Sequence, residues 1–173
     1  AGASVIASSR DLARAEAVVT ELPSPGGAKH HAVVIDQIDE PTIASGFASA
    51  VDQAGQIDIL INNGHAGGAS DWTNVDSEEF NRQLSNATGY FLLARRFRDH
   101  IVERKAQGSV VIIGSMYGVV ASYPDAYAGV CPASPVAYHA LKGGLIHMTR
   151  HLAAYWAGDG IRVNCLSPGP FPN

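Results

Sequence analysis

Tyr138 and Lys142 are the residues of this chain whose types and spacing point most directly to chemistry. They lie four positions apart in the stretch SPVAYHALKGG, which has the pattern of a helix start. Residues at i and i+4 share one face of a helix. A nearby ammonium stabilises a phenolate and so lowers the pKa of a phenol, which is about 10 in isolation. The pair therefore predicts a general acid/base for an alcohol or carbonyl oxygen, and the alternative is an inert pair on a helix surface.

Two further polar residues could assist an acid/base of this kind. Ser115 follows an apolar run, and its hydroxyl could donate to the substrate oxygen. The simpler interpretation is a serine that caps a strand or a turn. Asn86 interrupts the apolar stripe of a long helical pattern, although asparagine disfavours helix interiors. It could hold a water in a proton relay, or it could only distort the helix or face solvent.

Short apolar runs rich in β-branched residues alternate with helical patterns along the chain. The runs are continuous, as is typical of strands buried on both faces, and cover residues 3–8, 31–36, 57–62, 109–114 and 161–166. The helical patterns cover 11–22, 41–54, a long segment opening at Asp76, and a last one with Ser134 as N-cap and Pro135 as its first residue. This alternation predicts an α/β fold: a Rossmann-type, doubly wound parallel sheet with helices on both faces.

The predicted strands indicate independently where the functional site lies. In such sheets, ligands bind beyond the carboxyl ends of the strands. The segments NNGH, GSMYG and SPGP follow the last three apolar runs. We therefore expect the functional residues at this edge of the sheet.

Composition excludes several classes of partner. The chain has 173 residues and a net charge of -4, and its mild acidity argues against nucleic acid. The apolar runs are too short to span a membrane.

Cys131 and Cys165 lack CxxC spacing, so we expect two free thiols in a reducing, cytoplasmic setting. His147 and His151 have a metal-ligand spacing without an evident third ligand, and no metal is expected.

Five segments occur together along the chain: DILINN at 58–63, NATGYF at 86–91, GSMYG at 114–118, the Tyr-x-x-x-Lys pair, and IRVNCLSPGP at 161–170. In this order, and over nearly the whole chain, they resemble the short-chain dehydrogenase/reductase family. It implies that Tyr138 is the acid/base, that Lys142 stabilises its phenolate and binds the nicotinamide ribose, and that Ser115 polarises the substrate oxygen. It also implies that Asn86 anchors a relay water.

The same resemblance implies where the cofactor is held. Asp36 matches the residue that contacts the adenine, and Asn62 and Gly64 belong to the turn that the family writes Asn-Asn-Ala-Gly. Pro168 and Gly169 match the turn beside the nicotinamide. The turn here reads NNGH, so His65 places a side chain where the family usually has none.

The resemblance further predicts a single domain over residues 1–173 that is truncated at both ends. The glycine-rich phosphate loop is expected before residue 1 and the substrate loop after Asn173. A strand of the family would then be absent between the runs 3–8 and 57–62, and we expect a gap in the sheet there.

The end of the first apolar run indicates the nucleotide. An Asp or Glu at the end of the second Rossmann strand binds the ribose 2′-hydroxyl of NAD. Ser9 stands at this position and Arg10 follows it, so a 2′-phosphate would meet hydrogen-bond donors and a bidentate cation. NADP(H) is predicted, with NAD(H) as the alternative. The simpler interpretation of Arg10 is a solvated residue at a helix entry.

The predicted function is an NADP(H)-dependent oxidoreductase that interconverts a small-molecule secondary alcohol and a carbonyl. By resemblance, a homodimer or homotetramer is expected. Two alternatives stay open: a sugar-nucleotide epimerase or dehydratase that uses the same Tyr/Lys pair, and a non-catalytic binding protein on this fold.

Overall fold

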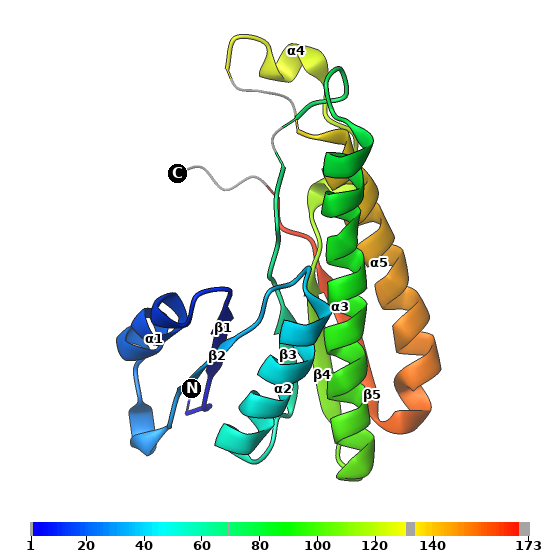
Figure 1. Cartoon of the computed structure of the whole chain (residues 1–173). Helices are drawn as coiled ribbons and strands as arrows, with labels where there is room; N and C mark the ends of the chain where they lie inside the picture. The colour runs from blue at the N-terminus through cyan, green and yellow to red at the C-terminus, as the bar shows by residue number, and fades with distance from the viewer. Residues whose placement is uncertain (1, 69, 131–133, 170–173) are drawn as a thin grey trace.

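The computed structural model describes residues 2–68, 70–130 and 134–169 (Figure 1). Strands and helices alternate in the order β1 (Ile6–Ser9), α1 (Leu12–Glu21), β2 (His31–Val34), α2 (Glu40–Ala54), β3 (Ile59–Asn62), α3 (Ser77–Glu103), β4 (Gly108–Ile113), α4 (Pro124–Tyr127), α5 (Val136–Trp156) and β5 (Ile161–Leu166). Short 3-10 turns lie at Pro25–Gly27, Met116–Gly118 and Ala157–Asp159. The predicted α/β alternation is confirmed, and α4 is an addition to it.

The strands form two parallel sheets. β1 pairs with β2, and β4 lies between β3 and β5. Among the described residues β1 does not pair with β3, so the predicted gap between the first and third strands is confirmed. Because the strands within each sheet are parallel, the carboxyl ends of β3, β4 and β5 share one edge.

The two long helices begin close to the predicted positions. Asp76 caps α3, and its side chain accepts a hydrogen bond from the Glu79 backbone N–H at 2.8 Å. α5 begins one residue later than predicted, with Pro135 rather than Ser134 as N-cap. The reason is that the Pro135 backbone is extended (ψ 138°), so its carbonyl is the first to accept, from the Tyr138 N–H at 3.0 Å.

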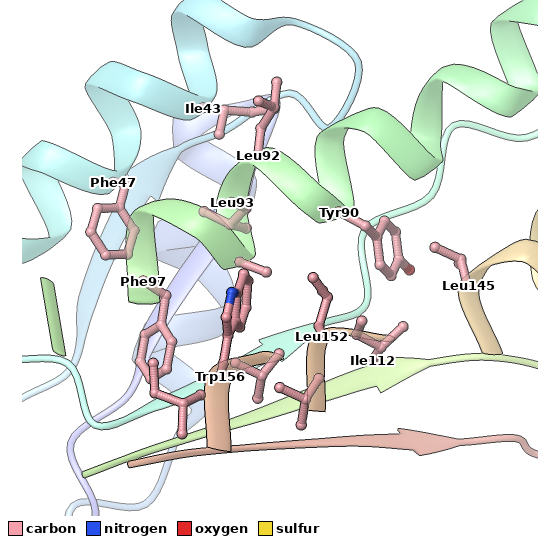
Figure 2. Close-up of a cluster of buried hydrophobic side chains, with 14 of the residues drawn as sticks. Ile43, Phe47, Tyr90, Leu92, Leu93, Phe97, Ile112, Leu145, Leu152 and Trp156 are labelled. Atoms are coloured by element: carbon pink, nitrogen blue, oxygen red, sulfur yellow. The ribbon is translucent and has the colours of Figure 1, made fainter. Parts of the chain in front are cut away.

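The core lies between α3, α5 and one face of the β3–β4–β5 sheet, and α2 extends it (Figure 2). Val110 and Ile112 of β4 point into it and are fully buried, as are Phe97 of α3 and Leu145 of α5. The alternation along β4 shows that a continuous apolar run need not be buried on both faces.

The opposite face of this sheet is exposed within the described chain. Ile59 and Ile61 of β3 are 61% and 63% exposed, and Leu166 of β5 is 57% exposed. The expectation that every strand is buried on both faces is therefore wrong for this sheet, because α3 and α5 cover only one side of it. Helices do flank β1 and β2 on both sides, where α1 and α2 pack (Figure 1).

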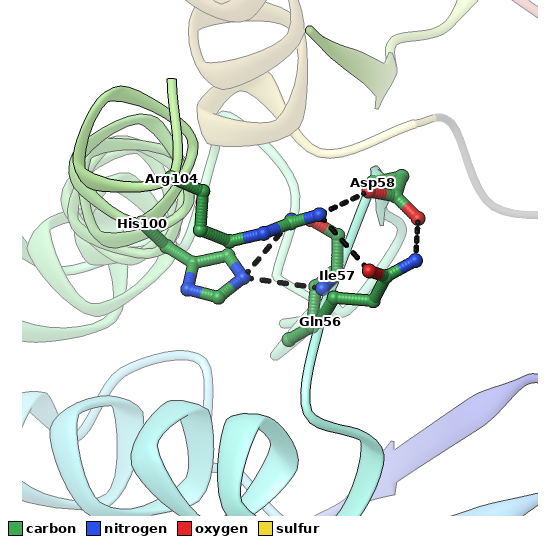
Figure 3. A network of polar contacts seen from close by, with 5 residues as sticks. All are labelled: Gln56, Ile57, Asp58, His100 and Arg104. Atoms are coloured by element: carbon green, nitrogen blue, oxygen red, sulfur yellow. Dashed lines mark hydrogen bonds and ion pairs between the residues drawn. The ribbon is translucent and has the colours of Figure 1, made fainter. Parts of the chain in front are cut away.

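A polar network fixes the amino end of β3 against the last turns of α3 (Figure 3). Arg104 donates to the Ile57 carbonyl at 3.1 Å and pairs with Asp58 at 2.9 Å. His100 Nε2 accepts from the Ile57 N–H at 3.2 Å. The network sets how β3 enters the sheet, at the end of the strand away from the expected site.

No helix in the described part of the chain is long and apolar enough to cross a membrane.

Candidate active site

A cleft of about 380 Å³ lies where the segments after β3, β4 and β5 meet α5. Three of the predicted catalytic residues line it: Ser115, Tyr138 and Lys142. Two predicted cofactor residues, Pro168 and Gly169, line it as well. The remaining lining residues are Asn63, His65, Ile113, Gly114, Met116 and Tyr117. The fold thus brings together residues that are more than fifty positions apart in the sequence.

Lys142 is a buried cation on the cleft wall. It is 4% exposed, and its Nζ donates to the Ile113 carbonyl at 2.7 Å. Burial lowers the pKa of Lys142 below its usual range, while the nearby Cys165 acts in the opposite direction. An ammonium has three N–H donors, so this one bond leaves donors for a ligand in the cleft.

Tyr138 lies one helical turn before Lys142, on the same face of α5. The Lys142 Nζ is 5.5 Å from the centre of the Tyr138 ring. The rings of His65 and Tyr117 meet Tyr138 edge to face, at centroid distances of 5.4 Å and 6.5 Å. The ring of Tyr138 is therefore held between two aromatic neighbours in the cleft.

Ser115 is buried and caps the turn Met116–Gly118. Its Oγ accepts from the Tyr117 N–H at 3.2 Å, so the simpler interpretation of this serine is observed. A hydroxyl that accepts one bond keeps its own proton to donate, so capping and substrate polarisation are compatible. The turn packs tightly on α5. A Cβ at Gly118 would lie only 2.7 Å from the Lys142 carbonyl oxygen, so a larger residue would not fit there.

Asn86 is fully buried but does not line the cleft. Its Oδ1 accepts from the Ala66 N–H at 2.8 Å, and its Nδ2 donates to the carbonyls of Ala66 and Gln83. The side chain therefore fixes the segment after β3 against α3. Its predicted role with a relay water stays a prediction.

Three predicted cofactor residues lie near the strand ends outside the cleft lining. Asn62 is buried at the end of β3, and its Nδ2 donates to the Tyr90 carbonyl at 2.9 Å. Gly64 packs on Gln37, whose Oε1 would be 3.0 Å from a Cβ at this position. Asp36 follows β2, and its Oδ1 accepts from the Ile38 N–H at 3.1 Å.

The pair predicted to select the nucleotide lies on the other sheet, at the end of β1. Ser9 is the last residue of β1, and its Oγ accepts from the Asp11 N–H at 3.3 Å. Arg10 is exposed, and its guanidinium forms no ion pair with any of the described residues.

A larger and more open hollow, of about 690 Å³, lies at the start of α3. It contains none of the predicted site residues, and its lining includes Asp76, Glu78, Glu79 and Arg82. We assign the candidate site to the smaller cleft because that is where the predicted acid/base pair, Tyr138 and Lys142, lies.

Comparisons with known proteins show the family of this chain. The family model described as short chain dehydrogenase matches residues 1–172. The chain belongs to the short-chain dehydrogenase family. This short-chain dehydrogenase is similar to a protein of Xanthobacter autotrophicus named inactive 2-(S)-hydroxypropyl-CoM dehydrogenase 2. The two are 35% identical over 98% of this chain and 67% of that protein.

Two other relatives are similar over almost the whole chain. The galactitol 2-dehydrogenase (L-tagatose-forming) of Cereibacter sphaeroides is 31% identical, with 97% of this chain and 61% of that protein covered. The structure of a 3-ketoacyl-(acyl-carrier-protein) reductase from Brucella melitensis complexed with NADH matches with a TM-score of 0.80 and 28% identity, covering 97% of this chain and 65% of that one. This short-chain dehydrogenase thus spans about two thirds or less of the relatives' lengths.

The cleft of this short-chain dehydrogenase fits a nicotinamide cofactor. Lys142 offers unused donors from a buried position, as a ribose diol requires. Outside the cleft lining, at the end of β3, the Oδ1 of Asn62 is a buried acceptor without a partner among the described residues.

Two aromatic residues of the cleft, Tyr117 and His65, are not predicted as site residues from the sequence. Tyr117 lies within the GSMYG segment, and only the fold shows that its ring meets Tyr138. His65 departs from the family turn Asn-Asn-Ala-Gly, and this departure is the signal that the sequence offers for it. Burial, and then the charge of Lys142, lower the pKa of His65 below its usual range.

Proposed function

We propose that this protein is an oxidoreductase that interconverts a secondary alcohol and a carbonyl with a nicotinamide cofactor, and that Tyr138 is its acid/base. The observation that carries the proposal is the meeting of Ser115, Tyr138 and Lys142 in one cleft. When bound, the cofactor supplies or accepts the hydride at C4 of its nicotinamide ring.

The three side chains divide the remaining work. The Ser115 hydroxyl, whose proton is free, donates to the reacting oxygen. Tyr138 gives its phenolic proton to this oxygen during reduction and removes it during oxidation. The Lys142 cation stabilises the phenolate and holds ribose hydroxyls with its unused donors. Asn86 positions the segment after β3 and, as we further propose, anchors a water that replaces the proton of Tyr138.

We propose NADP(H) as the preferred nucleotide, supported by the exposed Arg10 beside Ser9, which has no ion pair within the described part of the chain. Asp36, Asn62, Gly64, Pro168 and Gly169 are the further residues that would contact it. We also propose a cytoplasmic homodimer or homotetramer, assembled through α3 and α5 as the resemblance to the family implies.

The name of the sugar-alcohol relative supports polyols as the first substrates to test. The experiment follows the nicotinamide absorbance of the full-length protein with a panel of secondary alcohols and their carbonyls. Tyr138→Phe should lower the rate by about a hundredfold or more, because it removes the exchangeable proton, and should leave the Kd for cofactor nearly unchanged. Lys142→Ala should reduce both, because the ribose contact is also lost.

Tyr155→Phe is the matched control, because Tyr155 lies on the same helix but is 73% exposed and does not line the cleft. It should behave as wild type. Undiminished turnover in Tyr138→Phe would end the acid/base assignment. Turnover of a nucleotide sugar without net change of the cofactor would favour the epimerase alternative.

A second candidate function is a non-catalytic binding protein. The specific observation in its favour is that the relative from Xanthobacter autotrophicus carries the word inactive in its name. Tight cofactor binding without hydride transfer to any member of the panel would decide for this candidate.

A further inference from the structure

His65 brings a titratable side chain into the cleft from the turn after β3. Its ring lies 5.4 Å from the ring of Tyr138 at an interplanar angle of 77°. It lines the same cleft as Lys142, Pro168 and Gly169. A Cβ at Gly67 would lie 3.6 Å from its Nε2, so the ring is also close to the backbone of its own segment.

The groups that face His65 do not neutralise a positive charge there. α5 contributes Tyr138 and the Lys142 cation, and the turn after β4 contributes Tyr117. Cys165 of β5 lies near Lys142, and Tyr90 of α3 lies near both Lys142 and Tyr138. None of the described residues lining the cleft is acidic. A protonated His65 would therefore be a second cation beside Lys142 without a carboxylate partner.

We propose that His65 is a specificity-determining residue that sets the preference of this cleft between the oxidised and reduced forms of the nicotinamide cofactor. The proposal rests on the function proposed above. The oxidised nicotinamide ring carries a positive charge and the reduced ring carries none. Neutral His65 accommodates both forms, whereas protonated His65 repels only the oxidised one.

The ratio of the two affinities isolates this effect. The phosphates of the cofactor are the same in both forms, so their attraction to an imidazolium cancels when the dissociation constants are divided. Binding linkage is reciprocal. The bound oxidised cofactor should therefore disfavour protonation of His65 more strongly than the bound reduced cofactor does.

The test measures Kd for NADP⁺ and NADPH between about pH 8 and pH 5, a range that extends below the ordinary histidine pKa of about 6.5 because the pKa of His65 is lowered. In wild type, the ratio of Kd for NADP⁺ to Kd for NADPH should rise by about three- to tenfold as pH falls. In His65→Gln the ratio should stay constant, because glutamine does not titrate. The control His147→Gln removes an exposed histidine outside the cleft and should keep the wild-type slope.

The possible results distinguish a failure of the inference about His65 from a failure of the proposed function. A constant ratio in wild type, or the wild-type slope in His65→Gln, would overturn the inference alone. Absence of dinucleotide binding at every pH would overturn the proposed function and the inference with it. If His65→Gln does not fold, NMR titration of the His65 ring in the two wild-type complexes decides, and equal pKa values in the two complexes would overturn the inference.

Discussion

At the scale of single residues, the cleft depends on one buried cation and the groups that it influences. Lys142 has one backbone hydrogen bond, to the Ile113 carbonyl, and lies within 6 Å of the ring centres of Tyr138 and Tyr90. Burial, and then proximity to Tyr138, raise the pKa of Tyr90 above that of an ordinary tyrosine, so Tyr90 stays neutral at physiological pH. Tyr138, unlike Tyr90, lines the cleft, and it is the cleft tyrosine that shares a helix face with Lys142.

Arg10 gives a prediction at the same scale. A charge-assisted hydrogen bond to the 2′-phosphate contributes about 1.5–3 kcal/mol, or about ten- to a hundredfold in affinity. Arg10→Ala should therefore weaken NADPH binding by about this factor and leave NADH binding little changed, as measured by fluorescence titration of both nucleotides. Arg14→Ala is the control, because it removes an exposed arginine of α1 one turn further along. Equal binding of NADH and NADPH by the wild type would contradict the assignment.

At the scale of elements, α3 positions the segment after β3 that carries His65. The amide of Asn86 holds the backbone of Ala66, and the Arg82 side chain donates to the Gly67 carbonyl at 2.8 Å. One turn further along α3, the Tyr90 carbonyl accepts from Asn62. These contacts with α3 hold the backbone before and after His65, and for this reason we expect His65 to keep its place against Tyr138.

The other end of α3 predicts a pH dependence of stability. Burial, and then the charge of Arg104, lower the pKa of His100 below its unfolded value. The unfolded chain therefore binds the proton more readily, and His100 costs stability as pH falls below about 6.5. The same proton would occupy the Nε2 lone pair that accepts from Ile57. The slope for one proton cannot exceed about 1.4 kcal/mol per pH unit.

Urea unfolding at several pH values checks this. His100→Gln keeps an acceptor for the Ile57 N–H but does not titrate, so its stability should fall less steeply than that of wild type between about pH 7 and pH 5. His151→Gln is the control, because His151 is exposed on α5 and takes no part in the network around Ile57. A wild-type slope in His100→Gln would show that the network around Ile57 does not depend on this protonation.

At the scale of the whole molecule, the described chain buries one face of the β3–β4–β5 sheet and exposes the other. Ile112 is fully buried beneath α3 and α5, whereas Ile61, on the neighbouring strand, is 63% exposed. The apolar contribution to stability therefore comes mainly from one side of this sheet. The second sheet, β1 with β2, carries helices on both sides but does not join the first.

The difference in burial between the two sheet faces can be tested by replacing one isoleucine on each face with alanine. Ile112→Ala should cost about 2–5 kcal/mol in free energy of unfolding, because it opens a cavity in a packed core. Ile61→Ala should cost about 1 kcal/mol or less, the range for an exposed strand position. Denaturant unfolding of both variants measures the difference. An equal loss at both sites would mean that the face bearing Ile61 is covered in the protein in solution.

The sequence by itself determined the features that depend on near neighbours in the chain. The helical period placed Tyr138 and Lys142 on one face of α5, and the Asp76 cap located the start of α3. The five apolar runs became the five strands, the last over the predicted residues 161–166. Each of these signals is contained in a few consecutive residues, so backbone propensity and periodicity suffice to read it.

The tertiary structure alone decided which distant groups meet. His65 lies against Tyr138, seventy-three positions away, and the Asn86 amide is bonded to Ala66 rather than facing the cleft. Likewise, the same kind of apolar run supplies a buried Ile112 and an exposed Ile61. Burial and side-chain contacts depend on which elements pack on a face, and this is set by long-range packing that no local pattern contains.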